Sequence, residues 1–142
     1  MVGTTYFIDA NIVVYSVGKP HFMKAPCLAI LEDMARRSVT SATNVEVLQE
    51  ILHIYTRRGE HTFGIEMARN LSVLVTTIYS VTPEDFARAL TLHSQYSRLT
   101  ARDSLHLASL YNNRITHIVS ADHHFDGLPG IVRIDPLGWE VR

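Results

Sequence analysis

The sequence predicts an α/β fold in which a mostly parallel central sheet of about five strands is flanked by helices. Short runs of β-branched residues alternate with longer segments of helical periodicity, and this alternation is typical of a parallel sheet covered by helices. The chain has 142 residues, of which 46% are hydrophobic and 19% are charged. This composition suits a compact globular protein. We therefore expect residues 1–142 to form a single domain.

The first half of the chain is expected to hold two strands and two helices. Residues 5–8 form an apolar run that predicts the first strand, and residues 24–36 have the spacing of a helix. A second strand is expected at residues 38–41. The helix predicted at residues 45–57 has a core-facing stripe made of Leu48, Ile51, Leu52 and Tyr55.

The second half is expected to hold three helices and three strands. The helical pattern of residues 62–73 is weaker, whereas a proline directly after Thr82 favours a helix over residues 83–96. Residues 101–112 form the last predicted helix, and asparagines, which tolerate the conformation found after helix ends, follow it. Strands are expected at residues 77–81, 117–120 and 131–134.

Composition excludes several classes of protein. A single cysteine cannot form an internal disulfide, and no charged and apolar leader precedes the first strand, so a cytoplasmic setting is expected. No apolar run approaches the ~18 residues that a membrane span requires. The net charge of −1 shows no basic excess, so nucleic-acid contacts would need local patches. Arginine pairs at 36–37, 57–58 and 98/102 are the candidates, although each is equally a solvated helix end.

Two carboxylates lie at the carboxyl ends of predicted strands. Asp9 comes after residues 5–8, and Asp122 comes after the strand at 117–120. Ligand sites in open α/β sheets gather beyond the carboxyl ends of the strands. Capping of a following helix is the alternative role for Asp9. Asp126 lies in the same turn as Asp122, and ordinary turn chemistry also explains it.

Three further carboxylates lie in the first two turns of predicted helices. Glu46 and Glu50 are four residues apart, so they share a helix face and repel each other unless a cation is near. Glu46 has an alternative role in a capping box with Thr43. Asp103 opens the helix at 101–112 and has an alternative role as a capping residue. Four acids from four separate segments fit a site for Mg²⁺ or Mn²⁺, which prefer oxygen ligands.

Other catalytic patterns are missing from the sequence. It contains no Gly-x-Ser-x-Gly elbow, no phosphate-binding glycine loop and no Cys-x-x-Cys pair. His123 and His124 are interpreted as exposed turn histidines rather than zinc ligands, because no spaced third ligand accompanies them. His53 and His106 are interpreted as core or rim residues. Divalent metal chemistry, which activates a water without a side-chain nucleophile, therefore remains.

Four ordered motifs resemble those of PIN domains, and their style resembles VapC-type toxins. They are Asp9-Ala10-Asn11, the helical Val47-Leu48-Gln49-Glu50-Ile51-Leu52, Ala101-Arg102-Asp103-Ser104-Leu105-His106, and Ser120-Ala121-Asp122-His123-His124-Phe125-Asp126. The resemblance covers essentially the whole chain. It implies a three-layer PIN-like fold and a metal-dependent endoribonuclease.

The resemblance also implies roles for individual residues. The catalytic and metal-binding acids are expected to be Asp9, Glu50, Asp103 and Asp122, with Asn11 positioning Asp9. Ser120 and Asp126 are expected in the outer part of the site, Glu46 is the alternative to Glu50, and Arg102 and His106 are candidate RNA contacts. The family further implies a homodimer that is inhibited by a cognate VapB-like antitoxin.

Two alternatives stay open at this point. One is a catalytically silent PIN-like module that binds RNA or a partner protein. The other is a magnesium-dependent phosphatase or receiver-type domain, whose acids also cluster at strand ends. The second alternative usually needs a late lysine, but the only lysines are Lys19 and Lys24.

Overall fold

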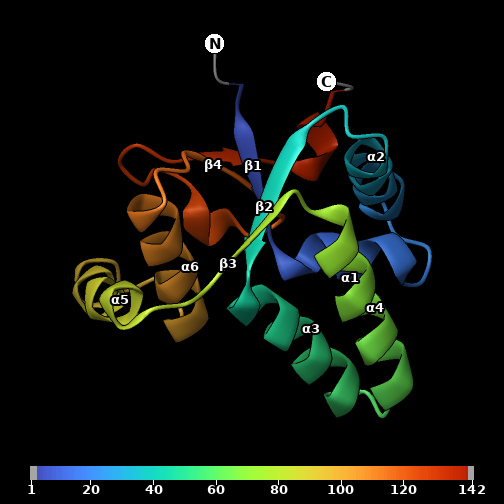
Figure 1. Cartoon of the computed structure of the whole chain (residues 1–142), viewed down its shortest axis with the longest axis horizontal. Coiled ribbons are helices and arrows are strands. Elements are labelled where there is room, and N and C mark those ends of the chain that lie inside the picture. The colour runs from blue at the N-terminus through green and yellow to red at the C-terminus, as the bar shows by residue number, and fades with distance from the viewer. Residues whose placement is uncertain (1–2, 141–142) are drawn as a thin grey trace.

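The computed structural model describes residues 3–140 and confirms an α/β fold with a central sheet (Figure 1). All strand pairings in the five-stranded sheet are parallel, and the strand order is β3-β2-β1-β4-β5. Each crossover between neighbouring parallel strands requires a connection long enough for a helix. The strands are β1 (Thr5–Ile8), β2 (Thr40–Asn44), β3 (Thr77–Tyr79), β4 (His117–Val119) and β5 (Val132–Ile134).

Within residues 3–140, six α-helices cover the sheet. In Figure 1, helices α1 to α4 lie on one side of the strands, and α5 and α6 lie on the other. These two helix groups and the sheet make three layers. The helices are α1 (Ala10–Val17), α2 (Lys24–Ala35), α3 (Val45–Arg57), α4 (His61–Leu74), α5 (Pro83–Gln95) and α6 (Ala101–Asn112), and two short 3₁₀ turns follow at His123–Phe125 and Pro136–Gly138.

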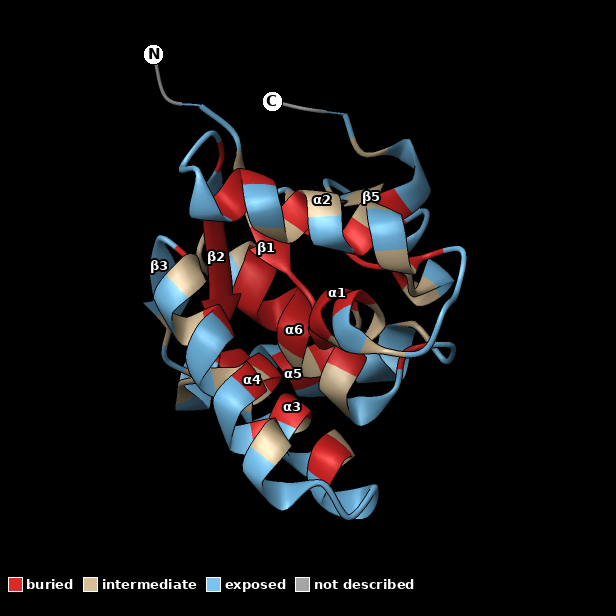
Figure 2. Cartoon of the chain, turned by 90° about the vertical axis from the view of Figure 1, so that its right-hand side faces the viewer, coloured by how far each residue is buried: buried red, intermediate tan, exposed pale blue. Residues whose placement is uncertain are grey.

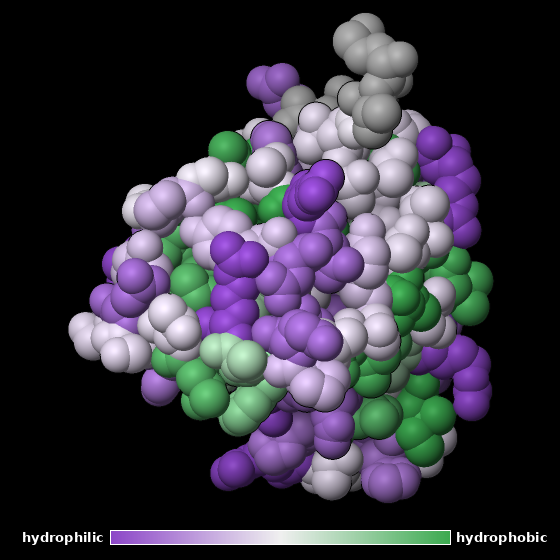
Figure 3. All heavy atoms as spheres, turned by 60° about the vertical axis from the view of Figure 1, so that its left-hand side comes forward, coloured by the Kyte–Doolittle hydropathy of each residue, from purple (hydrophilic) through white to green (hydrophobic). Residues whose placement is uncertain are grey.

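The core lies between the central strands and the helices. Phe7, Ile8 and Ile118 have no exposed surface, and Figure 2 shows buried residues concentrated on β1, β2 and the inner helix faces. On the side of α5 and α6, the surface carries both polar and apolar patches (Figure 3). No helix within residues 3–140 is long and apolar enough to cross a membrane.

Strand β2 differs from the prediction, because it covers Thr40–Asn44 rather than residues 38–41. Its small polar residues gave no apolar signal, yet Ser41 and Thr43 are fully buried. The hydroxyl of Thr43 donates to the carbonyl of Ile8 at 3.0 Å, so it is satisfied inside the sheet. The proposed capping box of Thr43 with Glu46 is therefore wrong, and Asn44 caps α3 instead by accepting from the Val47 amide.

A helix after Asp9, which corresponds to α1, was expected only in the alternative in which Asp9 is a capping residue. Its sequence, ANIVVYSV, is rich in β-branched residues that lower helix propensity. The capping carboxylate of Asp9 and the burial of Ile12 and Val13 stabilise it nevertheless. Tertiary packing thus decides the conformation of this segment.

Candidate metal centre

Three neighbouring strands end at one edge of the sheet. Strand β1 lies between β2 and β4, so its carboxyl end is flanked by theirs. Asn44 ends β2, Asp9 follows β1, and Ser120 follows β4. This edge therefore brings together segments that are far apart in the sequence.

Asp9 is a buried carboxylate that accepts hydrogen bonds from two neighbouring segments. Its side chain accepts from the Ala10 amide at 2.8 Å and from the Ser120 hydroxyl at 2.6 Å, and only 5% of the residue is exposed. Burial raises the pKa of Asp9, although His106 and the Ser120 hydrogen bond oppose this rise. The site thus holds a carboxylate whose negative charge is poorly solvated.

Ser120 connects the start of α1 to the end of β4. While its hydroxyl donates to Asp9, its oxygen lies 3.2 Å from the amide nitrogen of the Asn11 side chain and 3.0 Å from the backbone nitrogen of Asp122. The Asn11 carbonyl oxygen accepts from the Ala121 amide at 3.2 Å. Asn11 and Ser120 together therefore fix Asp9 relative to Asp122.

His106 fixes the position of Glu50. Its Nε2 lies 3.3 Å from a Glu50 carboxylate oxygen, and its Nδ1 lies 3.3 Å from the amide nitrogen of Asn44. Because the Asn44 amide is a donor, the hydrogen-bond pattern assigns the ring proton to Nε2. Burial opposes the imidazolium, but the hydrogen bond to Glu50 and the charge of Asp9 outweigh it and raise the pKa of His106.

The side chain of His106 is buried, whereas a direct RNA contact requires exposed surface. Only 1% of the residue is exposed, so its ring is directed at Glu50 rather than at the solvent.

A second cluster contains Asp103, Asp122 and His124. The Nδ1 of His124 lies 3.1 Å from an Asp103 oxygen and 3.2 Å from an Asp122 oxygen. Asp103 also forms a capping box with Thr100 at the start of α6. His124 lies in the 3₁₀ turn after β4, as the sequence indicated, and its 44% exposed side chain contacts both acids.

The chemistry of these side chains fits a divalent cation. No lysine or arginine among residues 3–140 forms an ion pair with any of the carboxylates in the two clusters. Carboxylate oxygens and imidazole nitrogens are common ligands of divalent ions. Two groups of three side chains have candidate ligand atoms within 4.8 Å of one another: Asp9, Glu50 and His106, and Asp103, Asp122 and His124. Both ring nitrogens of His106 are engaged by Asn44 and Glu50, so Asp9 and Glu50 are the ligands that remain in the first group.

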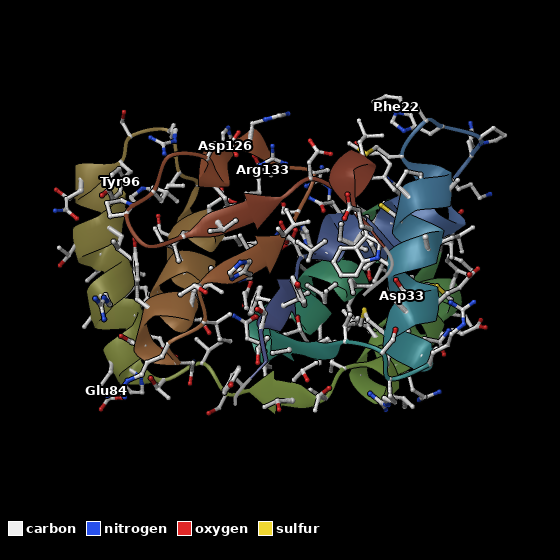
Figure 4. All side chains as sticks on the ribbon, turned by 90° about the horizontal axis from the view of Figure 1, so that it is seen from above. Phe22, Asp33, Glu84, Tyr96, Asp126 and Arg133 are labelled. Atoms are coloured by element: carbon white, nitrogen blue, oxygen red, sulfur yellow. The ribbon has the colours of Figure 1, made fainter. Side chains whose placement is uncertain are left out.

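The two remaining predicted acids have arginine partners. Glu46 lies 3.2 Å from Arg102. Asp126 lies 2.6 Å from Arg133 and also contacts His123, and Figure 4 shows Asp126 and Arg133 close together. The hydrogen bond from Arg133 lowers the pKa of Asp126. These two carboxylates are therefore neutralised within the protein.

Sequence reasoning missed two members of the site. Asn44 has a signal, since an asparagine directly before a helical pattern is a favoured cap, but its amide contact with His106 is 62 positions away in sequence. His124 follows Asp122 by two residues, and nothing in the sequence states which way a turn directs its ring.

Comparison with known proteins identifies the family of the fold. The model of the PIN domain family matches residues 6–131. Ribonuclease VapC23 of Mycobacterium tuberculosis is 34% identical over 117 residues, which cover 82% of this chain and 92% of the relative. Ribonuclease VapC13 of the same species is 34% identical over 130 residues, with 89% and 97% covered.

Solved structures share the fold at low sequence identity. The sarcin-ricin loop cleaving toxin VapC20 of Mycobacterium tuberculosis has a TM-score of 0.68 and 16% identity, covering 89% of this chain and 98% of its own. VapBC2 from Rickettsia felis, bound to a DNA fragment from its promoter, has a TM-score of 0.67 and 17% identity, with 92% and 98% covered.

Proposed function

Because this chain belongs to the PIN domain family, we propose that it is a metal-dependent endoribonuclease and the toxin of a VapBC-type toxin–antitoxin pair. The observation that carries the proposal is the set of carboxylates at the ends of β1 and β4 and on α3 and α6, which form no ion pair with a lysine or arginine within residues 3–140. The relatives named VapC ribonucleases support it. The substrate is RNA, and the setting is the cytoplasm.

We assign the metal ligands among the clustered acids. Asp9, Glu50, Asp103 and Asp122 would hold Mg²⁺ or Mn²⁺, and Glu50 is preferred to Glu46 because Glu46 is paired with Arg102. When bound, the divalent ion supplies Lewis acidity and lowers the pKa of a bound water. The imidazole of His124 adds a nitrogen donor that suits Mn²⁺ better than Mg²⁺.

The remaining residues of the site position these ligands. Ser120 and Asn11 hold Asp9 in place by hydrogen bonds, and His106 does the same for Glu50. Ligands that are held by such outer contacts lose less entropy when an ion binds. Arg102 has a 40% exposed side chain beside Glu46, so it is placed to bind an RNA phosphate near the acids.

The family also suggests the assembly. We propose that the chain acts as one nuclease domain over residues 1–142, forms a homodimer and is inhibited by a cognate VapB-like antitoxin. The structural likeness to VapBC2 supports the same kind of fold.

An RNA-cleavage assay tests the proposal. Wild-type protein should cut RNA with Mn²⁺ and lose this activity with a chelator. Asp9→Asn should reduce the rate at least about 100-fold, since it removes charge from the metal site. Glu66→Gln is the matched control, because Glu66 is an exposed acid on α4 with no described ion pair. If all arms show equal activity, or wild type shows none, the proposed nuclease function is rejected and a silent RNA-binding module is favoured.

A further inference from the structure

A hollow of about 990 Å³ lies between the end of α1 and the turn that joins α3 to α4. The loop after α1 contributes Lys19 and His21 to its wall, and the turn between the two helices contributes Arg58. Tyr15, Tyr55 and Phe63 supply aromatic rings. The hollow is therefore both aromatic and basic, unlike the acidic metal centre.

The hollow continues the metal centre along α1. Asn11, Val14, Tyr15 and Gly18 have the spacing of one helix face and are half-buried. Asn11 contacts Asp9 in the metal centre, whereas the other three line the hollow. A rise of ~1.5 Å per residue places Gly18 about 10 Å along the helix from Asn11. A polymer bound at the acids can therefore reach the hollow along this face.

Aromatic rings in and beside the hollow are stacked and accessible. Tyr15 and His21 stack with centroids 4.9 Å apart, and His21 and Phe22 stack at 4.3 Å. Phe22 is 66% exposed and lies at the outer edge of the molecule (Figure 4). A row of rings ending in an exposed face is a platform on which nucleobases stack.

The cations of the hollow lack acidic partners. Neither Lys19 nor Arg58 forms an ion pair within residues 3–140. The guanidinium of Arg58 lies over the Tyr55 ring at 5.5 Å, and Glu60 is the one carboxylate in the wall. Exposed cations beside aromatic rings fit a phosphate backbone with splayed bases.

We propose that this hollow is a subsite for single-stranded RNA that flanks the cleavage point, an inference that rests on the proposed nuclease function. Lys19 and Arg58 bind phosphates, and the Tyr15–His21–Phe22 row stacks bases. A protein segment is the competing occupant, but an apolar peptide gains nothing from two unpaired cations.

Binding of a labelled oligouridine strand, measured in chelator so that no cleavage occurs, tests the subsite. Phe22→Ala should weaken binding about tenfold through lost stacking. Phe86→Ala on α5 is the matched control, since Phe86 is 58% exposed on another face. Lys19→Gln should lower the slope of log affinity against log salt by about 0.7, the value for one phosphate on a single strand. Arg69→Gln, which removes an exposed cation of α4, should not change it.

A cleavage experiment separates the two proposals. With Mn²⁺, Phe22→Ala should raise KM for a long RNA strand and leave the rate on a dinucleotide unchanged, because a dinucleotide does not extend to the hollow. If the two variants bind RNA more weakly in chelator but wild-type protein cleaves no RNA, the hollow remains an RNA-binding site and the nuclease proposal is rejected. Wild-type affinity in both Phe22→Ala and Lys19→Gln would overturn the subsite and leave the hollow to a protein partner.

Discussion

Asp9 and Asp126 are both carboxylates near the carboxyl edge of the sheet, but their surroundings are opposite. Asp126 is exposed, and Arg133 contacts it at 2.6 Å and lowers its pKa. Asp9 is buried without a lysine or arginine partner within residues 3–140, and burial raises its pKa. Asp126 is neutralised by the chain itself, whereas Asp9 is the carboxylate that the proposed metal ion would neutralise.

The comparison shows how to separate structural acids from functional ones. A carboxylate with a resident arginine contributes to the fold, because the pair is complete without a ligand. A buried carboxylate beside other acids costs stability unless an ion is bound. The absence of an arginine or lysine partner within residues 3–140 is thus a better criterion for a candidate metal ligand than position in the turn, since Asp122 and Asp126 share that turn.

Metal should produce the largest difference between the two regions. Mn²⁺ at 100 times its dissociation constant should raise the free energy of unfolding of wild type by about 2.7 kcal/mol. Asp126→Asn should keep this increase, and Asp9→Asn should lose most of it. Denaturant unfolding with and without Mn²⁺ measures the effect. An equal increase in both variants would show that Asp9 does not hold the ion.

Removal of the Arg133 guanidinium should destabilise the fold around Asp126. Its side chain is 7% exposed and binds Asp126, Asp135 and the Ser120 carbonyl. Arg133→Met should lower the free energy of unfolding by about 2 kcal/mol, the scale of lost hydrogen bonds to charged groups. Urea titration measures it, with Arg69→Met as the control. Unchanged stability would mean that the arginine network contributes nothing.

Neutralising Asp9 should change the free energy of unfolding in the opposite direction. Since its pKa is raised in the folded protein, the charged form destabilises the fold at neutral pH. Asp9→Asn in chelator should therefore increase the free energy of unfolding by about 1 kcal/mol. A decrease in thermal and urea stability would contradict the view that Asp9 is a cost to the metal-free protein.

The pH dependence of Asp126 should give the smallest effect. Its folded pKa is below the ordinary value of 3.8, so its contribution is present above pH ~4 and is lost as the pH falls through the folded pKa. Asp126→Asn should reduce the fall in the free energy of unfolding in that acidic range. Above pH ~5 the free energy of unfolding of the variant should change with pH as it does in wild type. Urea midpoints across this pH range test the point; identical slopes below pH 4 would reject it.

The sequence predicted the elements whose signals are local. Helices α3 and α6 have the predicted bounds, because apolar periodicity and their first-turn residues agree. Strand β2 was misplaced because its buried Ser41 and Thr43 are satisfied by contacts with other segments. Helix α1 was not predicted from its own pattern, because its β-branched residues lower helix propensity.

The candidate acids at the strand ends also had a local signal in the sequence. Asp9 and Asp122 were visible because each lies at the carboxyl end of an apolar strand, where ligand sites of open α/β sheets gather. The roles of His124 and Arg133 depend on which segments become neighbours: β5 pairs with β4, and only this pairing brings Arg133 to the turn after β4. Such contacts follow from the tertiary fold and have no local signal.

The hydrogen bond between Ser120 and Asp9 joins residues 111 positions apart. A ribosome adding about 5–20 residues per second needs roughly ten seconds between them. Throughout that interval the nascent chain has Asp9 but not the strand that completes its surroundings. The site around Asp9 is therefore completed only late in translation. We expect that the chain cannot cleave the transcript that encodes it until its last segments have emerged and folded.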